Sequence, residues 1–245
     1  EHDVDTQFEW SQKEFGEHHI DSLKHISETY LNLRRYDKAL VYLNVLSNFY
    51  IYKTIQHKEA YDNLEYFKPY VDKCSAAREI GKFYVAFAEA ASYLEKLPRS
   101  VELSEEGITY LEKVKDSSLY EFGYLYLKSA EALSKLNSNA RSAEHFEKAS
   151  AIFTKQNDTL FYLWSQNGLA TLLGRNGLYA EAHKARKVVY ELGPKINEEQ
   201  VVAKWFLSIR DRSDPVQLSL RTTTRGAVKA RNNRKSSFWH QSNGE

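Results

Sequence analysis

The chain contains one stretch twice, at the interval that a single supersecondary unit would produce. The sequence Phe-Ala-Glu-Ala at 87–90 has its counterpart in Ser-Ala-Glu-Ala at 129–132, and Arg-Ser at 99–100 has its counterpart in Arg-Ser at 141–142. The offset is 42 residues in both pairs. Because this interval is too long for a heptad and too short for a second domain, it predicts a helical hairpin stacked on a copy of itself.

The composition favours helices over strands. Only 10 glycines and 4 prolines interrupt the 245 residues, of which 42% are hydrophobic, and long stretches are rich in Ala, Leu, Glu and Lys. From position 17 onwards, apolar residues recur at spacings of three and four, which is the period of amphipathic helices. We therefore expect an all-α fold.

The residues from Tyr30 to Leu40 carry a resemblance to a known family. Their sequence, Tyr-Leu-Asn-Leu-Arg-Arg-Tyr-Asp-Lys-Ala-Leu, resembles the middle of a tetratricopeptide repeat (TPR), and the pattern returns around Ala130 and Ala170 and, in degenerate form, around Ala88. The resemblance implies four hairpins over most of residues 17–194, wound into a right-handed α-α superhelix. Repeats nearer 40 residues, longer than the common repeat of roughly 34, also resemble those of kinesin light chains and bacterial peptide-sensing regulators.

The spacing of equivalent small residues is regular except at the start. It is 42 residues from Ala88 to Ala130 and 40 from Ala130 to Ala170, but 61 from Ser27 to Ala88. The excess of about twenty residues predicts one additional helix after the first hairpin, for which residues 60–71 supply an apolar stripe. A last helix is expected over residues 198–208.

Charge divides the chain unevenly. The formal net charge is +1, but residues 215–245 hold six Arg or Lys and one acid, which leaves 28 basic and 32 acidic residues in residues 1–214. We expect a polar N-terminal segment at 1–16, the repeat domain at 17–212 and a basic, disordered tail at 213–245. The basic residues of the tail are Arg221, Arg225, Lys229, Arg231, Arg234 and Lys235.

Motifs for catalysis and metal binding are absent from the sequence. It has no phosphate-binding glycine loop, zincin helix or Gly-x-Ser-x-Gly elbow, and the single cysteine, Cys74, stands in no nucleophile motif. His18 and His25 would lie two helical turns apart, too far to chelate one ion together. We therefore expect no enzyme activity, no cofactor and no metal.

The resemblance assigns the ligand site to the first helix of each hairpin. In tetratricopeptide arrays these helices line a concave groove that receives an extended peptide or a partner's helix. Basic and aromatic groups together suit a peptide with acidic and apolar side chains, although Glu89 and Glu131 would repel the terminal carboxylate that clamp-type members bind. The alternative is an ordinary solvated face. The groove residues implied are Lys24, Lys82, Glu89, Tyr93, Tyr124, Lys128, Glu131, Lys135, Trp164, Asn167 and Arg175.

These features predict a non-catalytic scaffold or adaptor that binds a peptide or partner helix in the groove. Two alternatives stay open: the sensing domain of a peptide-regulated bacterial regulator, and a nucleic-acid-associated protein acting through weak, salt-sensitive contacts of its tail. With one cysteine and no apolar run long enough to span a bilayer, we expect a cytoplasmic protein without membrane partners, or a nuclear one if the tail directs import. Methionine is absent even at position 1, which favours a trimmed, processed or designed chain.

Overall fold

The computed structural model describes residues 18–114 and 120–193, and within these ranges the chain is all-helical, as expected. The segment 1–16, the helix expected over 198–208 and the basic tail lie outside the described residues, as do both expected domain boundaries. The described part holds nine α-helices and one 3-10 helix: α2 (His18–Asn32), α3 (Tyr36–Tyr52), α4 (His57–Phe67), η1 (Lys68–Lys73), α5 (Ala77–Tyr93), α6 (Leu97–Val114), α7 (Glu121–Lys135), α8 (Asn139–Lys155), α9 (Thr159–Arg175) and α10 (Tyr179–Leu192).

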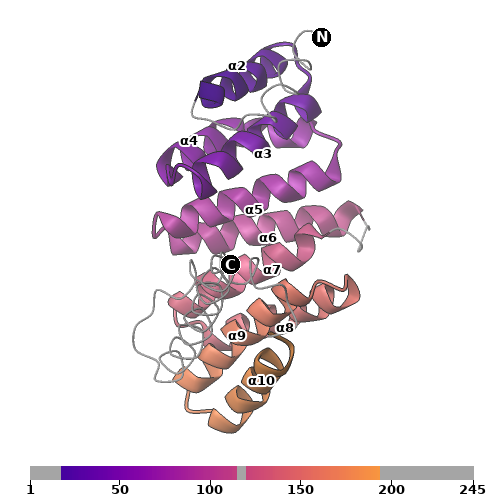
Figure 1. Cartoon of the computed structure of the whole chain (residues 1–245). Coiled ribbons are helices and arrows are strands. Elements are labelled where there is room, and N and C mark those ends of the chain that lie inside the picture. The colour runs from indigo at the N-terminus through magenta and orange to yellow at the C-terminus, as the bar shows by residue number, and fades with distance from the viewer. Residues whose placement is uncertain (1–17, 115–119, 194–245) are drawn as a thin grey trace, which may run out of the picture. The chain divides into compact units, whose positions relative to one another are not determined.

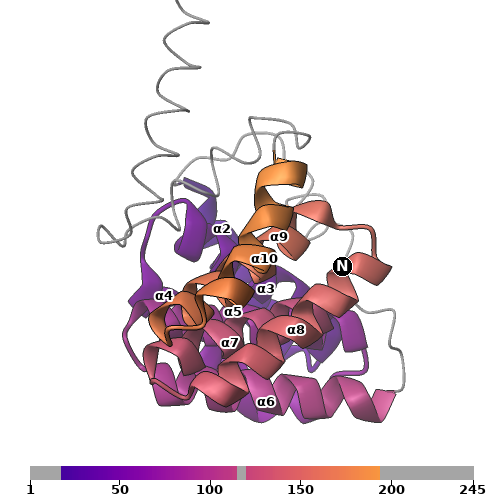
Figure 2. The ribbon, with the colours of Figure 1, turned by 90° about the horizontal axis from the view of Figure 1, so that it is seen from below.

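The helices stack as hairpins in chain order (Figure 1). Four hairpins are formed by α3 with α4 and η1, by α5 with α6, by α7 with α8, and by α9 with α10. Seen from below, α6, α8 and α10 lie at successively different inclinations (Figure 2). The stack is therefore a superhelix of helical hairpins, which confirms the expected fold class.

Helices α2 and α3 pack on each other, as expected, and the hydroxyl of Ser27 donates to the carbonyl of Ala39 at 3.1 Å. The row of first helices nevertheless begins one helix later than the sequence indicated. Helix α4, which we expected to be an additional helix, packs on α3, and α3 runs alongside α5 as α5 runs alongside α7. The side-chain amide of Asn44 on α3 donates to the backbone carbonyl of Glu79 on α5 at 2.9 Å. In this frame Ser47, not Ser27, is the counterpart of Ala88, and its distance of 41 residues matches the later spacings of 42 and 40.

The repeated Ser and Ala residues join the two helices of a hairpin. The hydroxyl of Ser100 on α6 donates to the carbonyl of Ala88 on α5, and the hydroxyl of Ser142 on α8 donates to the carbonyl of Ala130 on α7, both at 2.8 Å. Both serines are fully buried, so each hydroxyl needs such a partner. The small alanines let the helix axes approach closely enough for these bonds to form.

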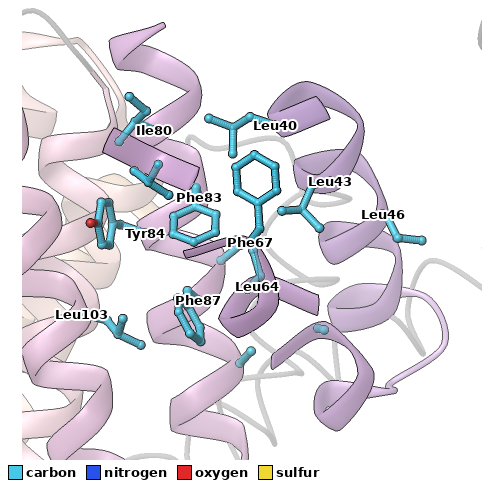
Figure 3. Close-up of a cluster of buried hydrophobic side chains, with 14 of the residues drawn as sticks. Leu40, Leu43, Leu46, Leu64, Phe67, Ile80, Phe83, Tyr84, Phe87 and Leu103 are labelled. Atoms are coloured by element: carbon cyan, nitrogen blue, oxygen red, sulfur yellow. The ribbon is translucent and has the colours of Figure 1, made fainter. Parts of the chain in front are cut away.

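Part of the core fills the space between α3, α4 and α5. Leu64 and Phe67 of α4 lie between the leucines of α3 and the rings of Phe83 and Phe87 on α5 (Figure 3). The centroids of Phe83 and Phe87 are 5.6 Å apart with ring planes at 65°, an edge-to-face contact that aromatic pairs prefer. This packing places α3 beside α5 and so starts the row of first helices.

Helix α7 contributes to two hydrophobic clusters. Phe122 and Leu125 belong to the cluster that extends back to α2, whereas Leu127 and Ala130 belong to a second cluster with α8 and α9. Successive residues of one helix therefore point into different cores, and α7 connects the two.

Asp37 fixes the start of α5 from the start of α3. Its carboxylate accepts hydrogen bonds from the amides of Ser75 and Ala76, at 2.7 and 3.0 Å, and from the Ser75 hydroxyl at 2.7 Å. Partial burial opposes ionisation of Asp37, but the hydrogen bonds outweigh it and lower its pKa. The ionised carboxylate thus lies at the N-terminus of α5, where the helix dipole favours a negative charge.

Aromatic rings of α8 pack directly on the backbones of its neighbours. A Cβ added at Gly168 of α9 would lie 2.4 Å from a ring carbon of Phe146, and one added at Gly123 of α7 would lie 2.7 Å from the ring of Phe153. At Gly174, in the same helix as Gly168, the nearest atom would be 3.8 Å away. Of these three glycines, packing therefore requires Gly123 and Gly168 but not Gly174.

Replacement of these α9 glycines by alanine should have opposite effects. Gly168→Ala should lower the free energy of unfolding by about 1–3 kcal/mol, because the ring of Phe146 must move. Gly174→Ala should raise it by up to about 1 kcal/mol, because alanine is the better helix former. Urea unfolding measures both changes, and equal shifts in the two variants would contradict the close contact at Gly168.

The turn inside each hairpin contains one residue with positive φ. These residues are Ile55, Glu95, Asn137 and Gly177, with φ of 58°, 57°, 59° and 78°, spaced by 40, 42 and 40 residues. Glycine and asparagine tolerate this region, but a β-branched residue is an outlier there. Ile55 is also 71% exposed, so burial does not offset the strain.

Exchange of the residues at two equivalent turns should test this strain. Ile55→Asn should raise the free energy of unfolding by about 1 kcal/mol, and Asn137→Ile should lower it by about the same amount, because only asparagine suits the left-handed backbone. Chemical denaturation of the two variants beside the wild type gives the comparison. A loss of stability in Ile55→Asn would mean that the isoleucine side chain contributes more than its backbone costs.

Candidate functional site

A chain of polar side chains connects the four first helices. The Tyr52 hydroxyl of α3 donates to Glu89 of α5, and the ammonium of Lys128 on α7 donates to Glu89 at 3.0 Å and to Glu131 at 3.3 Å. The indole nitrogen of Trp164 on α9 donates to Glu131 at 2.9 Å. We call these five residues the polar ladder, and the surface of α3, α5, α7 and α9 on which it lies the first-helix face.

Lys128 is the centre of the ladder. Its side chain is 13% exposed and that of Glu89 is 7% exposed. Burial disfavours the ammonium, but Glu131 and Glu89 outweigh this effect and raise the pKa of Lys128 well above its usual value. The pKa of Tyr52 is also raised, by desolvation and by the charge of Glu89, so the phenol keeps the proton that it donates.

Three of the expected groove residues are not placed as an open binding surface requires. Lys24 lies on α2, which precedes the first hairpin and so is not part of the row of first helices. Glu89 is buried because Tyr52 and Lys128 both bond to its carboxylate. Lys128 directs its charge into the ladder, so it does not offer a free cation to an acidic ligand.

The aromatic residues of the expected groove join α7 to α9. The rings of Tyr124 and Phe161 have centroids 4.5 Å apart at 67°, and Trp164 stacks on Phe161 at 5.9 Å and 12°. Burial raises the pKa of Tyr124. Asn167 is half-buried on the same helix as Trp164. The expected residue Lys82 is half-buried and pairs with Glu79 of its own helix at 2.6 Å.

A second set of side chains stands exposed in the last turns of the first helices. Tyr52 and Tyr93 are 53% and 50% exposed, and Lys135 and Arg175 are exposed as well. They occupy equivalent positions, spaced by 41, 42 and 40 residues. We call these four residues the outer row.

Sequence reasoning missed part of this surface. Tyr52 was not assigned to it, and neither were Ile55 or His57, whose ring stacks on Tyr93 at 4.2 Å and 16°. The signal was present, because Tyr52 precedes Tyr93 by 41 residues, the length of one repeat.

Other chemistry finds little support in the described part of the chain. It contains no group of three or more His, Cys, Asp or Glu that could hold a metal ion, and no helix in it is long and apolar enough to cross a membrane. Cys74 is buried, and burial raises the pKa of its thiol to about 12, so the reactive thiolate is scarce at neutral pH. The basic residues of the tail lie outside the described residues.

Comparison with solved structures identifies the fold. The putative kinesin light chain TPR-like repeats of Podosopora anserina match at a TM-score of 0.58 and 20% identity, over 78% of this chain and 93% of that one. A variant of the same repeats with one substituted residue has the same TM-score and identity over 78% and 94%. BtubC (BKLC) from P. vanneervenii matches at 0.63 and 12% identity, over 99% of this chain and 93% of that one.

No family model matches the chain, and no curated protein sequence is significantly similar to it. The structural matches are below 25% identity, so they define the fold and not the activity. The fold is a TPR-like helical repeat, as the resemblance at Tyr30–Leu40 implied.

Removal of the central ammonium should destabilise the stack. Lys128→Met should lower the free energy of unfolding by about 3 kcal/mol, because the buried carboxylate of Glu89 and the half-buried carboxylate of Glu131 lose their shared cation. Folding raises the pKa of Lys128. Its contribution to the free energy of unfolding is therefore complete below the ordinary lysine pKa of about 10.4, and it is lost only as the pH rises through the higher pKa of the folded state. The deficit should therefore stay constant from about pH 6 to 9.

Lys58→Met is the matched control for this variant. Lys58 bonds to Asp62 on the exposed surface of α4, and surface pairs contribute little, so its removal should leave stability unchanged. Urea unfolding across the pH range measures both variants. A Lys128→Met deficit no larger than that of the control would show that the ladder does not stabilise the stack.

Proposed function

We propose that this chain is a non-catalytic scaffold or adaptor that binds a protein or peptide partner on its first-helix face. The observation that carries the proposal is the outer row. Tyr52 and Tyr93 leave half of their surface in solvent on two neighbouring helices, and Lys135 is exposed at the equivalent position of α7, the next first helix. Exposed aromatic and cationic side chains grouped on one face are the residues that contribute most to protein interfaces.

The polar ladder also supports this proposal, because it fixes the helices that carry the outer row. Because its members are paired with one another, it holds the first helices in fixed register without needing a ligand to satisfy a buried charge. Side chains standing on such a support are already ordered, which reduces the entropy that a partner must overcome on binding. The ladder therefore positions the binding surface, and of its five members only Tyr52 also belongs to the outer row.

The cytoplasm is the compartment that we propose for this scaffold. The single cysteine is a free, buried thiol, and a chain with no disulfide partner of its own suits a reducing environment.

The proposal is tested by changing exposed residues only, since Lys128 and Trp164 belong to the ladder. We would combine Tyr93→Ser with Lys135→Glu on the first-helix face and compare this variant with Tyr190→Ser plus Lys155→Glu, the same changes at exposed positions of the second helices. Pulldown with mass spectrometry identifies partners, and calorimetry with the purified partner measures direct binding. A third chain ends at Asp214 and lacks the basic tail.

The first-helix variant should bind its partner at least about tenfold more weakly, as expected for loss of a central aromatic contact. Its circular dichroism should be unchanged, and the second-helix variant should bind like the wild type. Full affinity in the first-helix variant would overturn the proposal. Loss of binding only in the chain that ends at Asp214 would assign the interaction to the tail instead.

A further inference from the structure

The turns inside the four hairpins follow one another along one edge of the stack. His57, at the end of the first turn, stacks on Tyr93, at the start of the second, with ring centroids 4.2 Å apart. The side-chain amide of Asn139, at the end of the third turn, donates to the side-chain oxygen of Asn176 in the fourth at 2.7 Å. Since α5 also packs along α7, the four turns form a continuous surface. We call this surface the turn edge, and it comprises residues 52–57, 93–97, 135–139 and 175–179.

Large apolar side chains project from the turn edge into solvent. Ile55 in the first turn is 71% exposed, and Leu136 in the third is 40% exposed. In the fourth turn, Leu178 and Tyr179 are 47% and 75% exposed. Exposed apolar groups collected on one side of a protein mark a docking surface, and these stand on the turns and not on the helix faces that line the groove.

Cations accompany these apolar side chains. The turn edge holds four basic residues and one acid, Glu95, so its formal charge is +3. Each turn contributes one of the cations, and Lys53 and Lys135 are among those exposed. A second copy of this chain would bring a like charge to the edge, so that self-association there is disfavoured. The complementary surface is anionic. The four cations are Lys53, Lys96, Lys135 and Arg175.

We propose that the turn edge docks on an anionic lipid surface, with Ile55, Leu178 and Tyr179 entering the interfacial layer and the cations of the turns contacting acidic headgroups. Apolar and aromatic side chains next to Lys and Arg are the combination that binds at the membrane interface. Each basic residue close to an anionic leaflet adds to the attraction. The apolar side chains are distributed over separate turns, and a fluid bilayer surrounds each of them without a preformed pocket.

Docking of this kind needs no membrane-spanning helix. It therefore departs from our sequence-based expectation of no membrane partner, which rested on the lack of an apolar run long enough to span a bilayer. It also goes beyond the proposed function, because it assigns a second surface. The outer row lies where the turn edge meets the first-helix face, so the rest of that face stays accessible to a protein partner.

The strained backbone of Ile55 supports this assignment. At the equivalent turns the chain uses Asn137 and Gly177, which suit positive φ, so a better residue for stability exists at this position. Strain of this kind clusters at binding sites. Insertion into the interfacial layer gives the exposed isoleucine a role that asparagine could not fill.

Vesicle flotation with the full chain tests the proposal. The chain should float with vesicles of phosphatidylcholine mixed with phosphatidylserine but not with vesicles of phosphatidylcholine alone, and added salt should weaken the binding. Failure to float with the mixed vesicles would overturn the proposal. A chain that ends at Asp214 should bind the mixed vesicles as well, and loss of binding only in this chain would assign it to the basic tail.

Three substitutions on the turn edge probe the two kinds of contact. Ile55→Asn with Leu178→Ser should weaken vesicle binding at least about tenfold, because two apolar side chains no longer leave water. Lys53→Glu should weaken it at least about fivefold, because a cation is replaced by an acid. The matched control is Leu33→Ser with Lys155→Glu, at exposed positions of the opposite edge, and it should bind like the wild type.

Ile55→Asn alone separates binding from stability. It should weaken vesicle binding severalfold while raising the urea midpoint of the chain, an outcome that damage to the fold cannot produce. Full vesicle binding by this variant would overturn the insertion of Ile55.

A fluorophore at the same position reports insertion directly. Ile55→Cys can be labelled selectively with an environment-sensitive dye, because Cys74 is buried and its thiol pKa is raised to about 12. Binding to the mixed vesicles should shift the emission to shorter wavelength, and nitroxide groups on the acyl chains should quench it. The same label on Leu33→Cys should not respond. An unchanged emission at position 55 in the vesicle-bound chain would show that another surface binds the lipid.

The remaining outcomes keep this inference separate from the proposed function. Loss of vesicle binding in Ile55→Asn, with the protein partner of the pulldown still bound, would support two independent surfaces. A dye at position 55 that responds to that purified partner, but not to vesicles, would overturn the lipid surface and assign the turn edge to the protein. Vesicle binding without any protein partner would leave this inference standing and overturn the scaffold.

Discussion

Close approach of helix backbones is the constraint on which this stack depends. The buried hydroxyl of Ser142 reaches the carbonyl of Ala130, and the ring of Phe146 leaves no room for a Cβ at Gly168. These contacts set the distance between a helix and its neighbours, and a hairpin alone could not bury its apolar side. The first helices consequently stand in a row near enough for Glu89 and Lys128, 39 residues apart in sequence, to form a buried ion pair.

The sequence was sufficient to predict the repeat and its period, but not the position at which the first repeat begins. Ala88, Ala130 and Ala170 mark equivalent sites because helix packing demands a small residue there. Ser27 and Ser47 both satisfy that demand, and only the packing of α3 on α5 decides between them. The local pattern at Tyr30–Leu40 covers only the turn between α2 and α3, so it indicated the TPR-like fold without fixing which helix is the first of each hairpin.

The site residues were predicted in part for the same reason. Glu131, Lys128 and Trp164 were placed on first helices from their spacing, and their helices are as expected. Their mutual bonds could not be read from spacing, because these depend on how each helix is shifted along its neighbour. From the sequence alone, a charged residue on a helix face is expected to be solvated. Glu89 is buried in part because Tyr52 of α3 bonds to its carboxylate, and α3 had not been counted among the first helices.

The two-sided packing of α7 has a consequence for how the array behaves as a whole. With Phe122 and Leu125 in one cluster and Leu127 and Ala130 in the other, each half of the described stack lacks a complete core without this helix. Linear arrays gain their cooperativity from interfaces between neighbours, and α7 supplies the interface that unites these two clusters. The two clusters are therefore coupled through α7. Unfolding of this helix alone would separate them, so that order in one half of the described array would no longer stabilise the other half.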